Sequence, residues 1–363
     1  MRRFADSMFM CSAVVLALAA CEGDAGSDAQ AEPPVPLASR LEASLSVLAA
    51  DSMEGRRTGT EGAHRAARFL AAELERYGVE PAGDDDGYLQ HVPLAWVRVQ
   101  VGGATRERLM LPSDDLDFDT IPDDRILTEE ANVVGIVRGS DPAVSDEVVV
   151  IGAHYDHVGI GEPVDGSSEG TDSIYNGADD DASGTVAILE IARDLVEGPS
   201  PRRTVVVLLS TGEESGLLGT RWYIENPVAS LSLTVANLQI EMIGRPDPEA
   251  GGFGRGWLTG YERTTMGNQL TEAGSPIVPD PRPEMNFFFR SDNIAFARIG
   301  IPAHTLSSYN MHTDYHQPSD EIDEIDFQHM EALVEAAIEA VRFLTDGPTP
   351  SWTEGGMEGL MGY

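Results

Sequence analysis

The segment Val148-Val-Val-Ile-Gly-Ala-His154 is a short, mostly β-branched apolar run that ends in a histidine. Such a run predicts a strand that is buried on both faces of a sheet. Three further apolar runs follow, at residues 204–210, 234–240 and 300–306. Segments with helical spacing alternate with them, at residues 183–196, 216–224, 262–273 and 325–344. This alternation predicts an α/β fold with a mixed, largely parallel central sheet and helices on both faces.

The sequence before this segment predicts further elements of the same domain. Helical spacing covers residues 37–50 and 63–77, and Gly78 ends the second helix. Apolar or alternating stretches at residues 88–101 and 132–138 predict strands. Residues 159–177 are polar and predict a long loop. We therefore predict one α/β domain over residues 37–345, followed by a C-terminal tail at 346–363.

The composition excludes several classes of partner. The chain has 363 residues, and its 61 acidic residues against 24 basic ones give a net charge of −37. Such a surface repels nucleic acid and anionic lipid, so we expect neither as a partner. The two cysteines, Cys11 and Cys21, are too few and too close to the N-terminus to build a disulfide scaffold.

The N-terminus has the features of a targeting segment. Arg2 and Arg3 precede an apolar stretch that is too short to span a bilayer as a mature helix, and the stretch ends in Leu-Ala-Ala-Cys21. This pattern resembles a bacterial lipoprotein signal, so we predict a signal peptide at residues 1–20 and a lipid on Cys21. Residues 21–36 lack periodicity and predict a flexible tether. We expect an exported, periplasm-facing or cell-surface lipoprotein that touches the membrane only through this anchor.

Two acidic segments point to metal chemistry. They are Asn176-Gly-Ala-Asp-Asp-Asp-Ala-Ser-Gly184 and Thr211-Gly-Glu-Glu-Ser-Gly-Leu-Leu-Gly219. Carboxylates packed this closely repel one another unless a positive charge lies among them. Further candidate ligands stand at or just after predicted strand ends, where ligands gather in parallel sheets: His154, Glu241 and His316. His157, His304 and His329 have no partner motif, so we predict structural roles for them.

Other interpretations of these residues are weaker. Asp179, Asp181, Ser183, Gly184 and Glu190 match the spacing of an EF-hand loop, but a helix-breaking Asn-Gly pair precedes them where an EF-hand needs a helix. The chain contains neither a His-Glu-x-x-His motif nor a Gly-x-Ser-x-Gly elbow. Single-zinc peptidases of the helical type and serine hydrolases are therefore disfavoured.

Six motifs occur in a fixed order along the chain. They are Ala153-His-Tyr-Asp156, Gly177-Ala-Asp-Asp-Asp-Ala-Ser-Gly184, Gly212-Glu-Glu-Ser-Gly216, Glu241-Met-Ile-Gly244, Arg290-Ser-Asp292 and Tyr315-His-Gln-Pro-Ser-Asp320. Together with Met53-Glu-Gly-Arg-Arg-Thr-Gly-Thr60, they resemble the co-catalytic zinc peptidases of the M28 family, the aminopeptidase and glutamate carboxypeptidase type. The resemblance runs from about residue 37 to residue 345, and it implies that this domain is a peptidase domain.

The resemblance implies a set of roles for these residues. Asp180 bridges two zinc ions and is followed by a cis peptide bond. Glu214 and His316 complete one metal site, for which His312 is the alternative histidine. His154 and Glu241 complete the other site, although the family often has aspartate at the position of Glu241.

Further residues are expected to support the metal ligands. Glu213 remains unligated and acts as the base for a water shared by the two ions. We expect the carboxylates of Asp156 and Asp320 to accept the second ring N–H of His154 and His316, respectively. Arg290 and Asp292 are expected near the substrate pocket.

The implied function is hydrolysis of peptides by a dinuclear zinc exopeptidase, most naturally an aminopeptidase. Carboxypeptidase or dipeptidase action of the same family stays open. A glutaminyl cyclase-type acyl transferase with one zinc, or a binding module without catalysis, would each be expected to lack part of this residue set.

Overall fold

A computed structural model of the chain describes residues 35–167 and 170–360. Contacts divide the chain into a short unit, Met1–Val35, and a second unit, Pro36–Tyr363, that contains every described helix and strand. The predicted signal peptide, Cys21 and most of the predicted tether lie outside the described residues. No helix in the described part of the chain is long and apolar enough to cross a membrane.

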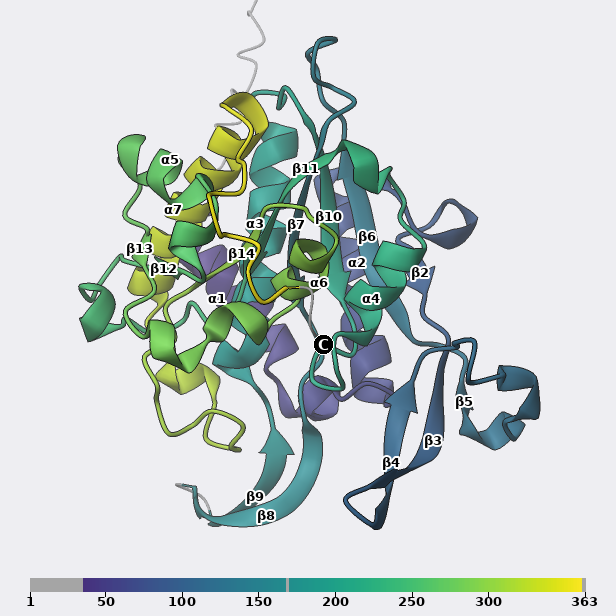
Figure 1. The fold of residues 1–363 in the computed structure, drawn as a ribbon. Coiled ribbons are helices and arrows are strands. Elements are labelled where there is room, and N and C mark those ends of the chain that lie inside the picture. Colours follow the sequence, from purple (N-terminus) through teal and green to yellow (C-terminus); the bar gives the residue numbers. More distant parts are fainter. Residues whose placement is uncertain (1–34, 168–169, 361–363) are drawn as a thin grey trace, which may run out of the picture. The chain divides into compact units, whose positions relative to one another are not determined.

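The centre of the fold is a mixed sheet (Figure 1). Its middle strand, β7 (Val148–His154), pairs in parallel with β10 (Thr204–Ser210) and β11 (Thr234–Ile240). Strand β14 (Ala303–Ser307) continues the parallel order beside β11, whereas β6 (Ala131–Val137) runs antiparallel to β10. Short strands complete the two edges: β1 (Glu80–Pro81) and β2 (Leu89–His91) on β6, and β12 (Trp257–Leu258) and β13 (Val278–Pro279) beyond β14. The predicted largely parallel sheet is confirmed.

The middle strands are buried on both faces, as their apolar composition predicts. Along β10, Val205, Val207 and Leu209 belong to the larger core cluster, whereas Val206 and Leu208 belong to a second cluster on the opposite face. This alternation follows from the two-residue period of side-chain direction in a strand.

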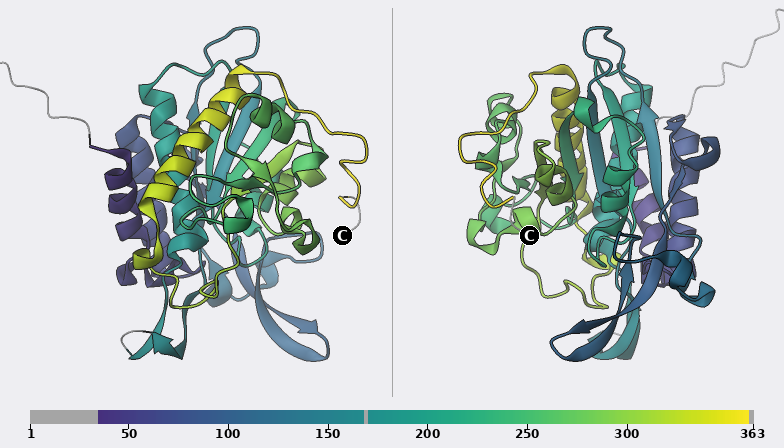
Figure 2. Two further views of the ribbon diagram at one scale, coloured as in Figure 1. Left: turned by 90° about the vertical axis from the view of Figure 1, so that its left-hand side faces the viewer. Right: turned by 45° about the vertical axis from the view of Figure 1, so that its right-hand side comes forward.

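Helices cover both faces of the sheet. The larger core cluster is formed with α1 (Leu37–Leu48), α2 (Glu61–Tyr77), α3 (Gly184–Glu197) and α7 (Phe327–Asp346). These four helices pack side by side, and the left view of Figure 2 looks onto α7 in yellow. The opposite face carries α4 (Leu218–Glu225) and α6 (Asn293–Arg298), while α5 (Met266–Glu272) lies beside β13. Helix α2 ends at Gly78, whose φ of 79° is left-handed, where the sequence predicts its end.

Two small sheets lie outside the central one. Strands β3 (Leu94–Val101), β4 (Ala104–Met110) and β5 (Ile126–Leu127) form one, and the ribbon β8 (Gly159–Ser167) and β9 (Gly170–Tyr175) forms the other. Both extend beyond the same edge of the central sheet (Figure 1).

Two predictions about these regions were wrong. Residues 159–177 were predicted to be a loop, but most of them form the β8–β9 ribbon. A two-stranded ribbon is held by backbone hydrogen bonds and needs no apolar alternation, so its polar sequence concealed it. The predicted strand 88–101 is divided into β2 and β3, and Pro93, which lacks a backbone donor, lies at the break.

The C-terminal residues after α7 pack against the domain. The Trp352 indole donates a hydrogen bond to the Gly300 carbonyl over 2.8 Å, and Leu360 is buried against the core beside α6. The described part of the predicted tail therefore covers one end of this core.

His304 in β14 gives a pH-dependent contribution to stability. Its ring is fully buried between the Thr259 carbonyl and the Thr264 hydroxyl, and burial lowers its pKa to about 4. As the pH falls, the unfolded chain binds this proton first, near its ordinary pKa of 6.5. The His304 contribution to stability should therefore be lost as the pH falls from 6.5 toward 4.

This expectation can be measured in metal-free protein by chemical denaturation. The difference in unfolding free energy between wild type and His304→Gln should shrink by about 2 kcal/mol between roughly pH 7 and pH 5. His91→Gln, at an exposed position, is the control and should show no such change. A wild-type minus His304→Gln difference that does not vary with pH would contradict the assignment.

Candidate metal centre

The carboxyl ends of the parallel strands bring the candidate ligands together. His154 is the last residue of β7 and pairs with Ser210 at the end of β10. Glu213 and Glu214 follow β10 after Gly212, whose φ of 70° allows the chain to turn sharply. Glu241 directly follows β11. Residues far apart in sequence thus meet at one edge of the sheet, as the strand order requires.

The triple aspartate forms an irregular turn before α3. Residues Ala178–Ser183 make one wide helical turn in which Asp180 and Asp181 have non-helical backbone angles. The peptide bond between Asp180 and Asp181 is cis, so the expectation taken from the family resemblance is confirmed. The outer two aspartates bind backbone after β11: Asp181 accepts from the Met242 N–H and Asp179 from the Gly244 N–H. Of the three aspartates, Asp180 is the one that belongs to the groups of potential metal ligands among the described residues.

The two carboxylate oxygens of Asp180 face different groups of side chains. Its Oδ1 lies 3.4 Å from His154 Nε2, and these atoms form one cluster with a carboxylate oxygen of Glu241. Its Oδ2 lies 3.1 Å from His316 Nε2, which is itself 3.0 Å from Glu214 Oε1. Asp180 therefore stands between two sets of potential ligands.

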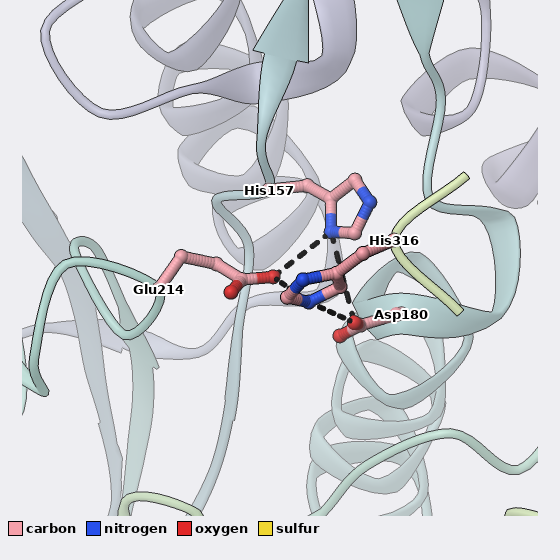
Figure 3. A group of neighbouring side chains, drawn as sticks. All are labelled: His157, Asp180, Glu214 and His316. Carbon is pink, nitrogen blue, oxygen red and sulfur yellow. Dashed lines mark ion pairs between the residues drawn. The ribbon is translucent and has the colours of Figure 1, made fainter. Parts of the chain in front are cut away.

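The second of these sets contains a residue that the sequence analysis missed. His157 Nδ1 lies 3.1 Å from Glu214 Oε1 and 3.8 Å from Asp180 Oδ2 (Figure 3). We predicted a structural role for His157 because no motif paired with it. Its position three residues after His154, in the turn that follows β7, was the one available signal.

Buried polar atoms without hydrogen-bond partners mark both sets. Among the described residues, they include His154 Nε2, His157 Nδ1, Glu214 Oε1 and His316 Nε2. Buried polar groups are rarely left unpaired, and a bound ion can satisfy those that have no protein partner. Imidazole nitrogens and carboxylate oxygens are also the ordinary ligands of Zn²⁺. The residues present therefore fit divalent cations at both sets.

The electrostatics of the centre agree with cation binding. Burial alone raises the pKa of Asp180, but its contacts with His154 and His316 outweigh burial and hold the pKa well below the usual range. Burial lowers the pKa of His316, but Asp180 and Glu214 together raise it to about 10. Burial also raises the pKa of Glu241 to about 7. The carboxylates thus favour a positive charge at this place, as a bound cation would supply.

Glu213 belongs to neither set of ligands. Burial is the largest cause that raises the pKa of its carboxyl group well above the ordinary value, and the nearby charge of Glu241 adds to it. Its backbone N–H donates to Asp156 Oδ1 over 3.0 Å, and Thr58 donates to the other oxygen of that carboxylate. Asp156 thus fixes the backbone beside Glu213.

The expected hydrogen bonds from the rings of His154 and His316 to the carboxylates of Asp156 and Asp320 do not form. His154 Nδ1 lies 3.0 Å from the backbone carbonyl of Asp156, while the nearer carboxylate oxygen is 3.8 Å away. Asp320 accepts the backbone N–H groups of Asp179 and Asp180 instead of the His316 ring. Both carboxylates instead accept hydrogen bonds from backbone N–H groups that are distant in sequence. The sequence motifs could not reveal these pairings.

The loop that carries His316 is fastened to the same turn. Arg245 binds Asp314 over 2.6 Å and Asp320 over 3.2 Å, and Asp320 in turn holds the backbone of Asp180. His312, the alternative histidine, contacts Asp179 Oδ2 at 3.1 Å and belongs to neither set.

Arg56 connects the two segments that present the ligands. Its side chain is fully buried, and it donates hydrogen bonds to the carbonyls of Leu48, Tyr155, Asn176 and Gly177. Tyr155 directly follows His154, and Gly177 lies three residues before Asp180. Burial lowers the pKa of Arg56 to about 10, and Asp180 opposes this shift.

A small pocket, with a cavity volume of about 40 Å³, opens beside Glu241. Besides Glu241, Met242 and Arg290, its lining consists of aromatic and hydroxyl side chains: Trp257, Thr259, Phe287, Ser291, Thr305, Ser307, Tyr309 and Tyr315. Arg290 lines this pocket. Asp292 is buried behind it, where it accepts a hydrogen bond from Ser210 over 2.5 Å.

A family model matches more than half of the chain, residues 132–341, and its description is peptidase family M28. The chain belongs to peptidase family M28. This match confirms the resemblance seen in the six motifs.

Individual relatives agree with the assignment. A probable zinc metalloprotease of Leptosphaeria maculans is 28% identical over 219 residues, which are 59% of this chain and 43% of that protein. The chain spans less than half the length of the curated relatives it matches.

Solved structures share the fold at low sequence identity. A zinc aminopeptidase from Bacillus subtilis aligns with a TM-score of 0.59 and 14% identity over 86% of this chain and 97% of that one. The glutaminyl cyclase of Porphyromonas gingivalis aligns with a TM-score of 0.55 and 16% identity over 84% and 97% of the two chains. These likenesses confirm the α/β fold.

Replacement of Arg56 should weaken both the fold and the metal centre. Arg56→Gln removes a buried cation and leaves backbone carbonyls unpaired, at an expected cost of about 3 kcal/mol or more in unfolding free energy. Metal affinity should fall as well, because the segments around His154 and Asp180 lose their common anchor. Denaturation and metal titration measure the two effects.

Arg57→Gln is the matched control. Arg57 is exposed and lies over the Trp96 ring, so its replacement should change the unfolding free energy and the metal affinity little. Equal unfolding free energies and equal metal affinities in Arg56→Gln and Arg57→Gln would show that the buried hydrogen bonds of Arg56 do not organise the site.

Proposed function

We propose that this chain is a dinuclear zinc exopeptidase, and most naturally an aminopeptidase. One observation carries the proposal: the two oxygens of Asp180 face two separate ligand sets, one with His154 and Glu241 and one with Glu214 and His316. The histidine and carboxylate ligands suit zinc, and the fold is shared with a zinc aminopeptidase.

In the proposed chemistry, the residues that bind metal differ from the residue that transfers protons. Bound zinc supplies Lewis acidity, which lowers the pKa of a water molecule and polarises the carbonyl group of the peptide. Glu213, free of the ligand sets and with a raised pKa, takes a proton from the attacking water. It then returns the proton to the departing amine. Asp156 orients Glu213 through the backbone N–H.

The pocket beside Glu241 supports exopeptidase action. The pocket adjoins a candidate metal ligand, and its aromatic walls favour an uncharged side chain next to the site of cleavage. We assign the pocket to the side chain of the N-terminal residue of a peptide.

Carboxypeptidase or dipeptidase action is the second candidate, and Arg290 is the observation that favours it. Its guanidinium group lies at the pocket over the Phe287 ring, 5.0 Å from the ring centre, where it could bind a substrate carboxylate. A glutaminyl cyclase-type acyl transferase shares the fold but would cyclise an N-terminal glutamine and leave the peptide bonds intact.

We also propose that the protein is an exported lipoprotein held at a membrane by a lipid on Cys21. The proposal rests on the sequence Leu18-Ala-Ala-Cys21 after a short apolar stretch. The domain would then act on peptides outside the cytoplasm.

Glu213→Gln should retain metal and lose activity. Removal of a general base is expected to reduce kcat by roughly 10²–10⁴-fold, with the metal content unchanged by elemental analysis. Glu214→Gln is the contrasting variant and should lose metal together with activity. Undiminished peptide hydrolysis by Glu213→Gln would rule out the base assignment.

N-terminal acetylation of the substrate distinguishes the directions of attack. An aminopeptidase should release the first residue from a free peptide and fail on its acetylated form, because the chemistry takes place next to the free amine. A peptide with an amidated C-terminus is the matched comparison. Cleavage of acetylated peptides, combined with failure on amidated ones, would favour carboxypeptidase action through Arg290.

Replacement of Cys21 tests the anchor. In a bacterial host, the wild-type chain should fractionate with membranes and incorporate a labelled fatty acid, whereas Cys21→Ser should do neither. Cys11→Ser is the control and should behave as wild type. Equal labelling of both variants would refute lipidation at Cys21.

A further inference from the structure

His157 is a buried side chain that the mechanism above does not use. Its exposed fraction is 1%, and neither ring nitrogen makes a well-formed hydrogen bond to any residue in the described ranges. Figure 3 shows its Nδ1 directed at the carboxylates of Glu214 and Asp180. A buried imidazole without a partner is costly, so its orientation calls for a ligand.

The distances among the four inward-facing side chains match those of a single ion. The contacts from His157 Nδ1 and His316 Nε2 to Glu214 Oε1 and Asp180 Oδ2 span 3.0–3.8 Å. Ligand atoms about 2.0–2.1 Å from one tetrahedral zinc ion lie roughly 3.3 Å apart. One cation among the four atoms would satisfy all of them.

The local backbone makes room for the His157 ring in this position. The ring packs against Gly177, where an added Cβ would come within 2.5 Å of His157 Cδ2. The His157 N–H donates to the carbonyl of Arg56, the residue that also anchors Tyr155 and Gly177. Arg56 thus holds the backbone of His157 through its own carbonyl group and the segments around His154 and Asp180 through its side chain.

We propose that His157 is a fourth protein ligand of the cation held by Asp180, Glu214 and His316. The inference rests on the proposed dinuclear function and deepens it, because the two metal sites then differ. The set of His154, Asp180 and Glu241 has three protein ligands, and the His157 set has four.

This difference assigns separate tasks to the two sites. Zinc sites with four protein ligands are typically closed and structural, whereas catalytic sites keep a position open. The four-ligand site therefore holds its ion more tightly, and the three-ligand site takes the carbonyl group of the substrate.

A hydrogen bond from His157 to Glu214 is the competing explanation. In that arrangement Nδ1–H would donate to Glu214 Oε1, and His157 would act only as a positioning residue. Loss of a residue that merely supports a ligand lowers metal affinity by roughly 10–100-fold, so affinity alone does not distinguish the two roles. The experiment must observe the imidazole itself.

NMR of the wild-type protein with ¹⁵N-labelled histidines provides this observation. The chain has eight histidines. On saturation with zinc, three imidazole rings should move to the shifts of metal-bound nitrogen if His157 coordinates, namely those of His154, His157 and His316. Only two should move if His157 is a positioning residue, and that result would overturn the inference. Because the experiment uses wild-type protein, its outcome does not depend on whether a variant folds.

Variants then identify the ring and its site. His157→Gln should remove one metal-bound resonance and lower the affinity for one zinc ion by more than about 100-fold, with the second ion retained. His312→Gln is the matched control, since His312 lies nearby but belongs to neither set, and should keep wild-type resonances and affinity. Retention of all metal-bound resonances in His157→Gln would contradict the proposal.

The outcome separates this inference from the proposed function. If wild type binds zinc, hydrolyses peptides and shows two bound rings, only the role of His157 fails. If wild type binds no second ion, the dinuclear proposal itself fails.

Discussion

The structure depends on one electrostatic constraint, the concentration of buried and half-buried carboxylates at the carboxyl edge of the sheet. Asp180, Asp181, Glu213 and Glu241 meet there, and burial is the largest single effect on the pKa of each. Like charges in such a place cannot all remain ionised without compensation. Some accept hydrogen bonds from backbone N–H groups, as Asp181 does from Met242, and others converge on positions that would suit a divalent cation.

In this scaffold, the residues that fix the backbone around the centre differ from the residues whose side chains face it. Arg56 and Asp320 hold backbone: one binds the carbonyls of Tyr155 and Gly177, and the other binds the N–H of Asp180. Because backbone groups are fixed in this way, the side chains of the ligand residues stay free to face the centre. Buried hydrogen bonds to charged groups are strong enough to keep such a turn in place.

Much of this arrangement was predictable from the sequence. The apolar runs ending at His154 and Glu241 located the sheet edge, and the six motifs gave the family. What the sequence could not supply was the detail of pairing: Asp156 and Asp320 bind backbone donors, and His157 turns into the centre. Each depends on the path of a turn, which hydrophobic periodicity does not encode. The β8–β9 ribbon was missed for the same reason, since its pairing leaves no apolar pattern.

Anomalous X-ray scattering from crystals of the zinc-loaded protein, recorded at the zinc edge, tests the central claim most directly. The account predicts two peaks about 3.5–4 Å apart, one on each side of the Asp180 carboxylate. One peak should lie beside His154 and Glu241 and the other beside Glu214 and His316. A single peak, or peaks that do not share Asp180, would contradict the account.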